Sequence, residues 1–524
     1  MAAASLVVRF IGFLYRIPLT RVVGDEGFAY YFAAYSIYTF AIALSSGTLP
    51  AALSKLTSER IARGHYYNAH NMFKTAMWFG AILGGLSGLV MFVFAGQFAA
   101  LINAPAAVNA IRTLAPTVLF VALLAVYRGY FQGMKTAIPT AISQVVEQIV
   151  KIIFTLLLVY LLMDATNMQP AIAGATAGTG IAAVAGLFVV IAIYAKSRKQ
   201  ILSNMKKDHP DKRTSSAQRY KAESKLQQVV AILQTALPMV LGMALLSASN
   251  LLDLRMPMSR MALSGAFTES EARALLGQFT SKFLLLTTLP ISLSVALSAA
   301  VIPEITSANI TLGAQAVRNK INMAARLSMM ISIPSAVGLA ILAYPVIALL
   351  FPSHPDGGWL LQYGAISIVF IALSHVLQGA LQGLGHVKLP VIATLVGVII
   401  KIPLNYVLIA IPGINILGLV ISNIVCFMVV AAINLYFLYS RTKIFPALAS
   451  AIIKPSIAAL GMGMVCYVVY ASFYFYLSNT VSTILAIGAG GASYLFFMLL
   501  IGGFRKSDID AMPIPAKIKK YLYM

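Results

Sequence analysis

The residues best suited to chemistry in this sequence are cations that interrupt apolar stretches. Arg16, Arg128, Lys151, Lys282 and Lys401 each lie within or at the edge of a run long enough to cross a membrane. A charge inside a bilayer is costly unless it is paired or hydrated, so such residues mark a polar cavity by default. Guanidinium and ammonium groups hold anions, and removal of water strengthens the contact. With few acidic residues nearby to neutralise them, these cations predict an anionic cargo.

The first apolar run carries two cations on one face. Arg9 and Arg16 are seven residues apart, which places both on the same side of a helix. Gly12 lies between them on that side and would let a partner helix approach. Because Arg9 is close to the N-terminus, a position at the membrane interface is an alternative for it.

The fifth apolar run carries a polar stripe. Gln144, Glu147, Gln148 and Lys151 are spaced three and four residues apart, so they share one helix face. Glu147 and Lys151 form an i,i+4 pair in the favourable order. The stripe therefore lines a cavity, with Gln144 and Glu147 as candidates for coupling, or it is a structural pair that holds the bundle together.

The other cations differ in how far they lie from the ends of their apolar runs. Arg128 and Lys282 are cavity residues or anchors that snorkel to the interface. Lys401 is too deep in its run to snorkel easily, so it faces a cavity or another helix. Three further polar candidates follow the seventh run: Asn250, Asp253 and Arg255.

Composition explains why these elements must be membrane helices. Of 524 residues, 60% are hydrophobic and 10% are charged, against roughly 45–50% and 25% in soluble proteins. Mean hydropathy is +0.87. These figures exclude a soluble globule, a disordered chain, a fibre and a disulfide scaffold. Cys426 and Cys466 lie in apolar runs and are interpreted as small hydrophobes. The histidines have no metal-ligand spacing and no GxxxxGK[ST] loop is present, which argues against a metal site and ATP hydrolysis.

Cutting the chain at charges and turn residues predicts fourteen transmembrane helices. Their ranges are 2–23, 28–53, 72–95, 110–133, 138–162, 170–194, 227–250, 279–302, 324–350, 360–383, 388–411, 416–439, 450–476 and 481–502. The first has no small-residue cleavage site after it and is expected to be a retained helix rather than a signal peptide.

The excess of positive charge orients these helices. The chain has 38 Lys and Arg against 15 Asp and Glu, a formal charge of +23. Most of the basic residues fall on one side of the membrane if the N-terminus is cytoplasmic, which is the positive-inside pattern rather than a nucleic-acid signature. The sequence therefore predicts a multi-pass plasma-membrane protein with both termini in the cytoplasm.

Four regions are expected along the chain. They are a six-helix bundle at 1–195, a basic cytoplasmic linker or short amphipathic helix at 196–226, a second six-helix bundle at 227–440, and two added helices with a basic tail at 441–524. The stretch 251–278 is expected to be the only long outer connection. Within it, Thr268 and Glu271 have the spacing of a helix capping box.

The two halves resemble each other at a nearly constant offset. Gln132-Gly133 corresponds to Gln382-Gly383, Pro139 to Pro390, and Lys151 to Lys401. Segments 1–6 are therefore predicted to repeat as 7–12. Because each repeat has an even number of spans, an axis along the membrane normal should relate the two, as in some transporters.

The stretch RGYFQGMKTAIPTAISQVVEQIVKIIF, residues 128–154, closely resembles the stage V sporulation protein B and MurJ-type lipid flippases. These belong to the MOP superfamily, which also contains the MATE exporters. Residues 11–31, 47–60 and 289–308 resemble the first, second and eighth helices of that family. The resemblance covers essentially the whole chain.

This resemblance implies two six-helix bundles in a V around a central cavity. It also implies a cargo of undecaprenyl-pyrophosphate-linked sugar, with lipid II the cargo of the peptidoglycan branch. Family members use arginines of the first helix and a basic residue at the start of the eighth, which match Arg9, Arg16 and Lys282. The last two helices, 450–502, would form a groove for the polyprenyl tail. The sequence departs from the family in having Lys at the eighth-helix position and no charge in residues 30–40.

The sequence therefore predicts a flippase that moves a lipid-linked sugar precursor, most specifically lipid II, by alternating access. A MATE-like cation-coupled exporter would need buried carboxylates, for which Glu147 and Asp253 are the candidates. A membrane-embedded glycan polymerase or ligase would need large outer loops. We expect a transporter rather than an enzyme and no cofactor, with coupling to a monovalent ion left open. The expected partners are the lipid-linked oligosaccharide, membrane lipids and cell-wall synthesis machinery, with no nucleic acid, and a monomer is expected.

Overall fold

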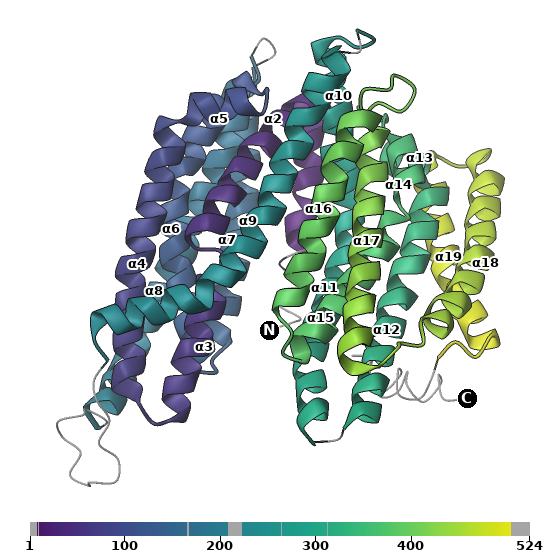
Figure 1. The fold of residues 1–524 in the computed structure, drawn as a ribbon. Coiled ribbons are helices and arrows are strands. Elements are labelled where there is room, and N and C mark those ends of the chain that lie inside the picture. Colours follow the sequence, from purple (N-terminus) through teal and green to yellow (C-terminus); the bar gives the residue numbers. More distant parts are fainter. Residues whose placement is uncertain are drawn as a thin grey trace. The chain divides into compact units, whose positions relative to one another are not determined.

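A computed structural model describes residues 8, 10–164, 167–207, 223–263, 265–311 and 313–504. Nearly all of these residues are helical, and no strand occurs within the described ranges (Figure 1). The prediction of an all-α membrane protein is confirmed.

The helices follow one another with short connections. In chain order they are α2 (Arg16–Ser45), α3 (Leu49–Ala62), α4 (Tyr66–Val93), α5 (Ala95–Leu101), the 3₁₀ turn η1 (Pro105–Ala107), α6 (Val108–Gly133), α7 (Ile138–Leu162), α8 (Gln169–Lys207), α9 (Lys225–Leu263), α10 (Glu269–Gln278), the π-helical turn η4 (Phe279–Phe283), α11 (Leu284–Thr311), α12 (Ala314–Ile341), α13 (Ala343–Leu350), α14 (Gly358–Gly364), α15 (Ser367–Gly383), α16 (Lys388–Leu408), α17 (Leu417–Thr442), α18 (Leu448–Tyr474) and α19 (Asn479–Leu500).

Twelve of the described helices are long and apolar enough to cross a membrane, or thirteen if α14 and α15, which meet at 47°, form one bent span. The predicted number of fourteen is therefore not confirmed. The first of the twelve covers residues 10–62, which contain the second predicted span and the part of the first from residue 10 onward. Gly24 interrupts it with a φ of 69°, outside the helical region. Glycine adopts such a φ without a steric penalty, which explains a break between Val23 and Asp25.

The chain forms two compact units, which meet in sequence between Met258 and Ser259, inside α9. In the first unit, α6 packs against α2, α3, α4 and α8, and α7 packs against α8. In the second unit, α11 packs against α12 and α15, and α17 packs against α15 and α16. The last two helices, α18 and α19, pack against each other and against α12.

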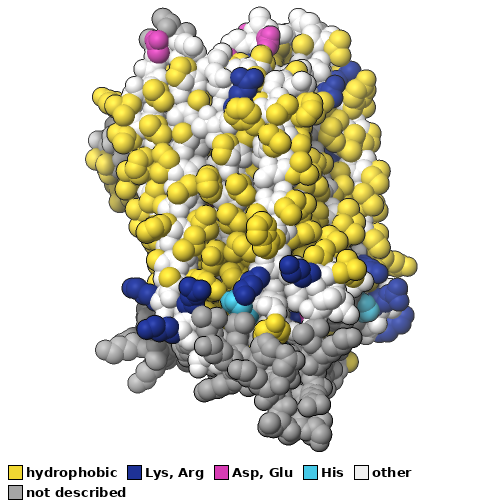
Figure 2. Space-filling model, turned by 90° about the vertical axis from the view of Figure 1, so that its left-hand side faces the viewer, with side chains coloured by type: hydrophobic (Ala, Val, Ile, Leu, Met, Phe, Trp, Pro, Cys, Tyr) yellow, Lys and Arg dark blue, Asp and Glu magenta, His cyan; other side chains and the backbone are white. Residues whose placement is uncertain are grey.

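Helix α4 shows how one helix serves both a protein contact and a lipid contact. Gly80, Gly84 and Gly88 lie one turn apart and face α6; a Cβ atom at Gly84 would lie 2.6 Å from the Cβ of Ala122. Small residues at such a spacing let two membrane helices approach closely. The opposite face is apolar and exposed, with Trp78 74% exposed. Figure 2 shows an apolar surface of this kind, with Lys and Arg side chains lining its lower end and a few more near the top.

The predicted internal repeat has a local counterpart in the backbone. After α6, Lys135 N–H donates to the Gln132 carbonyl at 3.0 Å; after α15, Gly385 N–H donates to the Gln382 carbonyl at 3.0 Å. Lys135 and Gly385 both have positive φ, 58° and 86°. The same left-handed turn therefore follows the matching Gln-Gly pair in each half.

The predicted connections differ from the observed ones. The predicted linker at 196–226 is helical through Lys207, where α8 ends, and again from Lys225, while residues 208–222 lie outside the described part. The stretch 251–278 is not a long outer loop, because α9 continues to Leu263. The capping box at Thr268 and Glu271 is confirmed, with both reciprocal hydrogen bonds present. The basic tail at 505–524 lies outside the described residues.

Candidate functional site

A buried lysine between two tyrosine rings is the centre of the site in the first unit. Lys151, on α7, is 6% exposed. Its Nζ lies 5.1 Å from the ring centroid of Tyr15 and 4.8 Å from that of Tyr35. The faces of aromatic rings carry negative potential and attract a cation at this distance. The Tyr15 hydroxyl lies 3.0 Å from the hydroxyl of Tyr31, so a hydrogen bond joins Tyr15 to a third tyrosine.

Arg16 belongs to the same group. It begins α2 next to Tyr15 and is half-buried. Its Nε is buried and has no hydrogen-bond partner among the described residues. Gly12, one turn earlier, lets Gln148 approach, because a Cβ there would lie 3.3 Å from the Gln148 Oε1. The predicted role of Gly12 as a contact point is consistent with this packing.

Neither cation of this group is neutralised within the described part of the chain. The ion pairs of the described residues include those that join Lys55 to Glu59, Arg60 to Glu223, Arg128 to Glu147, and Arg273 to Glu269. Lys151 and Arg16 take part in none of them. Tyrosine rings and hydroxyls stabilise a cation without cancelling its charge, so the group keeps a local excess of positive charge. We name Arg16, Lys151, Tyr15, Tyr31 and Tyr35 the tyrosine–cation site.

Glu147 pairs with a different cation from the one predicted. Its Oε2 accepts from Arg128 Nη2 at 2.7 Å, and Arg128 Nε donates to Ser143 Oγ at 3.0 Å. The i,i+4 pair of Glu147 with Lys151 is therefore a wrong expectation. Arg128 reaches across from α6, so the ion pair joins α6 to α7. Gln144, on the same helix, is half-buried.

Lys282 has structural contacts in the second unit. It is fully buried in the turn η4, and its Nζ donates to the backbone carbonyls of His354 and Asp356, both at 2.8 Å. The ring of Phe351 lies 5.8 Å from the same nitrogen. Lys282 thus anchors the connection between α13 and α14.

The other predicted residues lie elsewhere. Lys401 is buried on α16, 4% exposed, one turn before the buried Asn405. Asn250, Asp253 and Arg255 lie within α9 rather than after it; Asp253 is buried and the other two are exposed. Arg9 lies outside the described residues. Within the described positions, no group of three His, Cys, Asp or Glu side chains has the arrangement to hold a metal ion.

The tyrosines were not predicted as functional residues. Tyr31, Tyr35 and Tyr38 are spaced four and three residues apart on α2, and their rings follow one another with centroids 5.9 Å and 5.5 Å apart. This i, i+4, i+7 spacing in YYFAAYSIYTF was the available signal. It shows that the three side chains share a face, but the sequence does not show that Lys151 lies against that face.

A second feature is an apolar groove in the second unit. It has a volume of about 410 Å³ and lies between α11, α12, α18 and α19, with Leu289, Pro334, Gly338, Met462 and Tyr494 among its lining residues. A groove of this kind suits an aliphatic chain.

Comparison with known protein families assigns this chain to one of them. Residues 1–309 match the family described as polysaccharide biosynthesis protein, and residues 238–407 match the MatE family. The chain belongs to the polysaccharide biosynthesis protein family.

Two relatives from Bacillus subtilis (strain 168) align along almost the whole chain. One is the lipid II flippase MurJ, 26% identical over 97% of this chain and 95% of that protein. The other is stage V sporulation protein B, 24% identical over 99% of this chain and 97% of that protein. The predicted resemblance to the MurJ and stage V sporulation protein B branch of the MOP superfamily is therefore confirmed.

A solved structure shows the same fold. The lipid II flippase MurJ in an inward closed conformation superimposes with a TM-score of 0.65 and 16% identity, covering 94% of this chain and 98% of that one. Two of the proteins compared are named as lipid II flippases, which agrees with the prediction of a transporter rather than an enzyme.

Proposed function

We propose that this protein is a flippase for a polyprenyl-diphosphate-linked sugar precursor, and specifically for lipid II. It carries the precursor from the cytoplasmic to the outer leaflet of a bacterial plasma membrane by alternating access. The observation that carries this proposal is the tyrosine–cation site, in which the buried Lys151 and the half-buried Arg16 have no carboxylate partner among the described residues.

The chemistry of that site fits a diphosphate. Arg16 offers a planar fork of N–H donors with one buried donor unused, and Lys151 offers a compact point charge. Both interactions gain strength in a site from which water is removed. Because tyrosines rather than carboxylates hold the cations, an arriving anion does not have to displace an internal anion. Arg9, Arg128, Lys282 and Lys401 remain predictions as further contacts.

The apolar groove between α11, α12, α18 and α19 is proposed to hold the polyprenyl tail. Its lining is mostly aliphatic, and the precursor's tail is a long hydrocarbon that stays in lipid during flipping.

The membrane potential favours one direction of transport. An inside-negative potential favours outward movement of an anion by about 2.3 kcal/mol per charge per 100 mV.

The test is depletion of the protein in its host, followed by measurement of lipid II accessibility in the outer leaflet. We expect accessibility to fall on depletion, to recover with the wild-type chain, and to stay low with Arg16→Ala at normal membrane abundance. Lys55→Ala is the matched control, because Lys55 is exposed and its ion pair with Glu59 is 3.9 Å long. Unchanged accessibility on depletion, in a host without a related protein, would overturn the proposal.

The match of residues 238–407 to the MatE family makes a cation-coupled exporter the second candidate. That function needs an acidic residue free to exchange cations. Glu147 is already paired with Arg128, which makes it a poor choice. Drug susceptibility of the depleted strain separates the two, because an exporter raises resistance whereas a lipid II flippase supports wall synthesis.

The orientation is proposed from the distribution of basic residues, with both termini in the cytoplasm. Reporter fusions at residues 208–222 and after residue 524 should both report the cytoplasmic side. A periplasmic or extracellular signal from either fusion would contradict the proposed direction of transport.

A further inference from the structure

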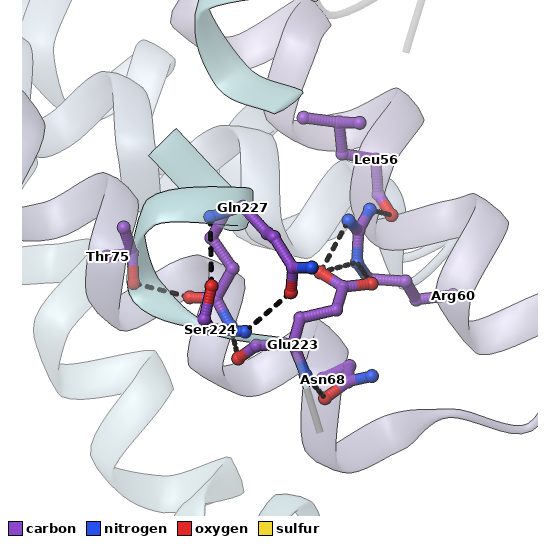
Figure 3. Close-up of polar contacts among 8 residues, drawn as sticks. Leu56, Arg60, Asn68, Thr75, Glu223, Ser224 and Gln227 are labelled. Atoms are coloured by element: carbon purple, nitrogen blue, oxygen red, sulfur yellow. Dashed lines mark hydrogen bonds and ion pairs between the residues drawn. The ribbon is translucent and has the colours of Figure 1, made fainter. Parts of the chain in front are cut away.

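The start of α9 is fastened to helix α3 of the same unit by an ion pair. Glu223 accepts three hydrogen bonds from the Arg60 guanidinium: Nε to Oε1 at 3.0 Å, Nε to Oε2 at 3.1 Å, and Nη2 to Oε2 at 2.7 Å. Arg60 Nη1 also donates to the Leu56 carbonyl at 2.8 Å, which fixes the guanidinium on α3 (Figure 3).

A second helix of the first unit holds the same segment. The Glu223 backbone N–H donates to Asn68 Oδ1 at 3.2 Å, and Thr75 Oγ1 donates to Gln228 Oε1 at 2.5 Å. Gln228 Nε2 in turn donates to the Glu223 carbonyl at 3.2 Å. Figure 3 shows these side chains converging on the first turn of α9 from α3 and α4. We name Arg60, Asn68, Thr75, Glu223 and Gln228 the α9 clamp.

The first turn of α9 is itself well defined. Ser224 N–H donates to Gln227 Oε1 at 2.9 Å, and Gln227 N–H donates to Ser224 Oγ at 3.3 Å. This reciprocal pair is a capping box, which satisfies backbone donors that the helix leaves free. The clamp therefore contacts the first turn of a capped helix rather than an irregular linker.

The clamped part of α9 has only a narrow apolar contact with the first unit. Gln228, Ile232 and Ala236, each one turn apart, are buried, whereas Leu226 and Leu233 are 74% and 42% exposed. Most of the large apolar side chains thus point away from the contact. The attachment depends strongly on polar groups, and the Arg60 and Glu223 side chains are still 12% and 26% exposed to solvent. Water can replace such contacts at modest cost.

Helix α9 also connects the two units, because the boundary between them falls inside it at Met258. Its 39 residues would extend roughly 58 Å as one helix, longer than the hydrocarbon core of about 30 Å. A change in the arrangement of the units must therefore bend α9 or move its start. Pro238 offers a bending point, since proline removes a helical hydrogen bond.

We propose that the α9 clamp is a conformational latch, closed in the state described and released in another state of the transport cycle. When the clamp opens, the start of α9 can move and the helix does not have to bend at Pro238. This proposal rests on the proposed function for the cycle itself, but the opening of the clamp is measurable without any cargo.

The first test locks the clamp. Thr75→Cys and Gln228→Cys are combined in a chain whose buried Cys426 and Cys466 are replaced by Ala. A short bis-methanethiosulfonate then bridges the new pair, leaving Arg60 and Glu223 intact. In proteoliposomes we expect flipping of a polyprenyl-diphosphate lipid to be lost on bridging and restored by reduction. The reduced sample is the folded control. Continued flipping by fully bridged protein would overturn the latch.

The second test needs no transport. Spin labels at Thr75→Cys and Gln228→Cys should report two separations, and Glu223→Gln should shift the population toward the longer one. Glu59→Gln is the matched control, because the Lys55–Glu59 pair is exposed and lies within α3. A single short separation, unchanged by Glu223→Gln, would overturn the latch. If that test succeeds while no reduced or wild-type protein flips any lipid tested, the proposed function fails and the latch does not.

Discussion

Replacing Lys151 by methionine should weaken the apparent affinity for the cargo roughly ten- to hundredfold without destabilising the protein. Methionine has a similar length and no charge, so Lys151→Met removes the cation between Tyr15 and Tyr35 and keeps most of the packing. If Lys151 stabilises the fold, its replacement lowers the free energy of unfolding. If Lys151 serves to bind the cargo, its replacement leaves the free energy of unfolding unchanged or raises it.

The magnitude follows from the contacts of the ammonium group. Each of its two cation–π contacts contributes about 2 kcal/mol when desolvated. Burying the charge costs several kcal/mol in real proteins. Because no carboxylate compensates among the described residues, these terms nearly cancel, and Lys151→Met should change the free energy of unfolding by about 0 to 2 kcal/mol in the stabilising direction. Loss of one charge-assisted contact to a diphosphate costs about 1.5–3 kcal/mol, roughly a ten- to hundredfold weaker affinity.

Two assays separate these effects. Thermal unfolding in detergent gives stability, and flipping in proteoliposomes over a range of lipid concentration gives the apparent affinity. Lys55→Met, at an exposed position, should change neither. A Lys151→Met protein that unfolds several degrees earlier than wild type, or that flips with unchanged affinity, would refute the reasoning.

Three further predictions concern packing and polar contacts. Glu147→Gln should lower the free energy of unfolding by about 2 kcal/mol, between the values for exposed and buried ion pairs, and a double-mutant cycle with Arg128→Met should show the coupling. Lys282→Met should cost about 3 kcal/mol by removing two charged hydrogen bonds, and hydrogen exchange should quicken in residues 352–357. Gly84→Ala should lower the melting temperature, because its Cβ would lie 3.2 Å from the Leu119 backbone, whereas Gly85→Ala, with nothing within 4 Å, should not. Equal melting temperatures for the two alanine variants would contradict the close packing of α4 on α6.

Features contained in one segment were predictable from the sequence. The predicted span 138–162 coincides with α7, and the capping box of Thr268 and Glu271 is present as predicted. The ends of α8 and α9 were not found, because both helices continue with polar residues beyond the apolar run that defines a span. Hydropathy marks where a helix enters lipid, but a helix ends where its backbone hydrogen bonds end.

The sequence by itself determined the class of protein, the apolar spans, the repeated Gln-Gly turns and the presence of cations within the membrane. Only the tertiary structure decided what those cations contact. Glu147 pairs with Arg128 of α6 at 2.7 Å instead of with Lys151 one turn away. An i,i+4 pair contributes only about 0.2–0.5 kcal/mol, which is too little to fix the partner against tertiary packing. Lys151 instead contacts a tyrosine ring of α2, and Lys282 donates to two backbone carbonyls of a loop. These partners are distant in sequence, and tertiary packing brings them together, so the local spacing of residues cannot predict them.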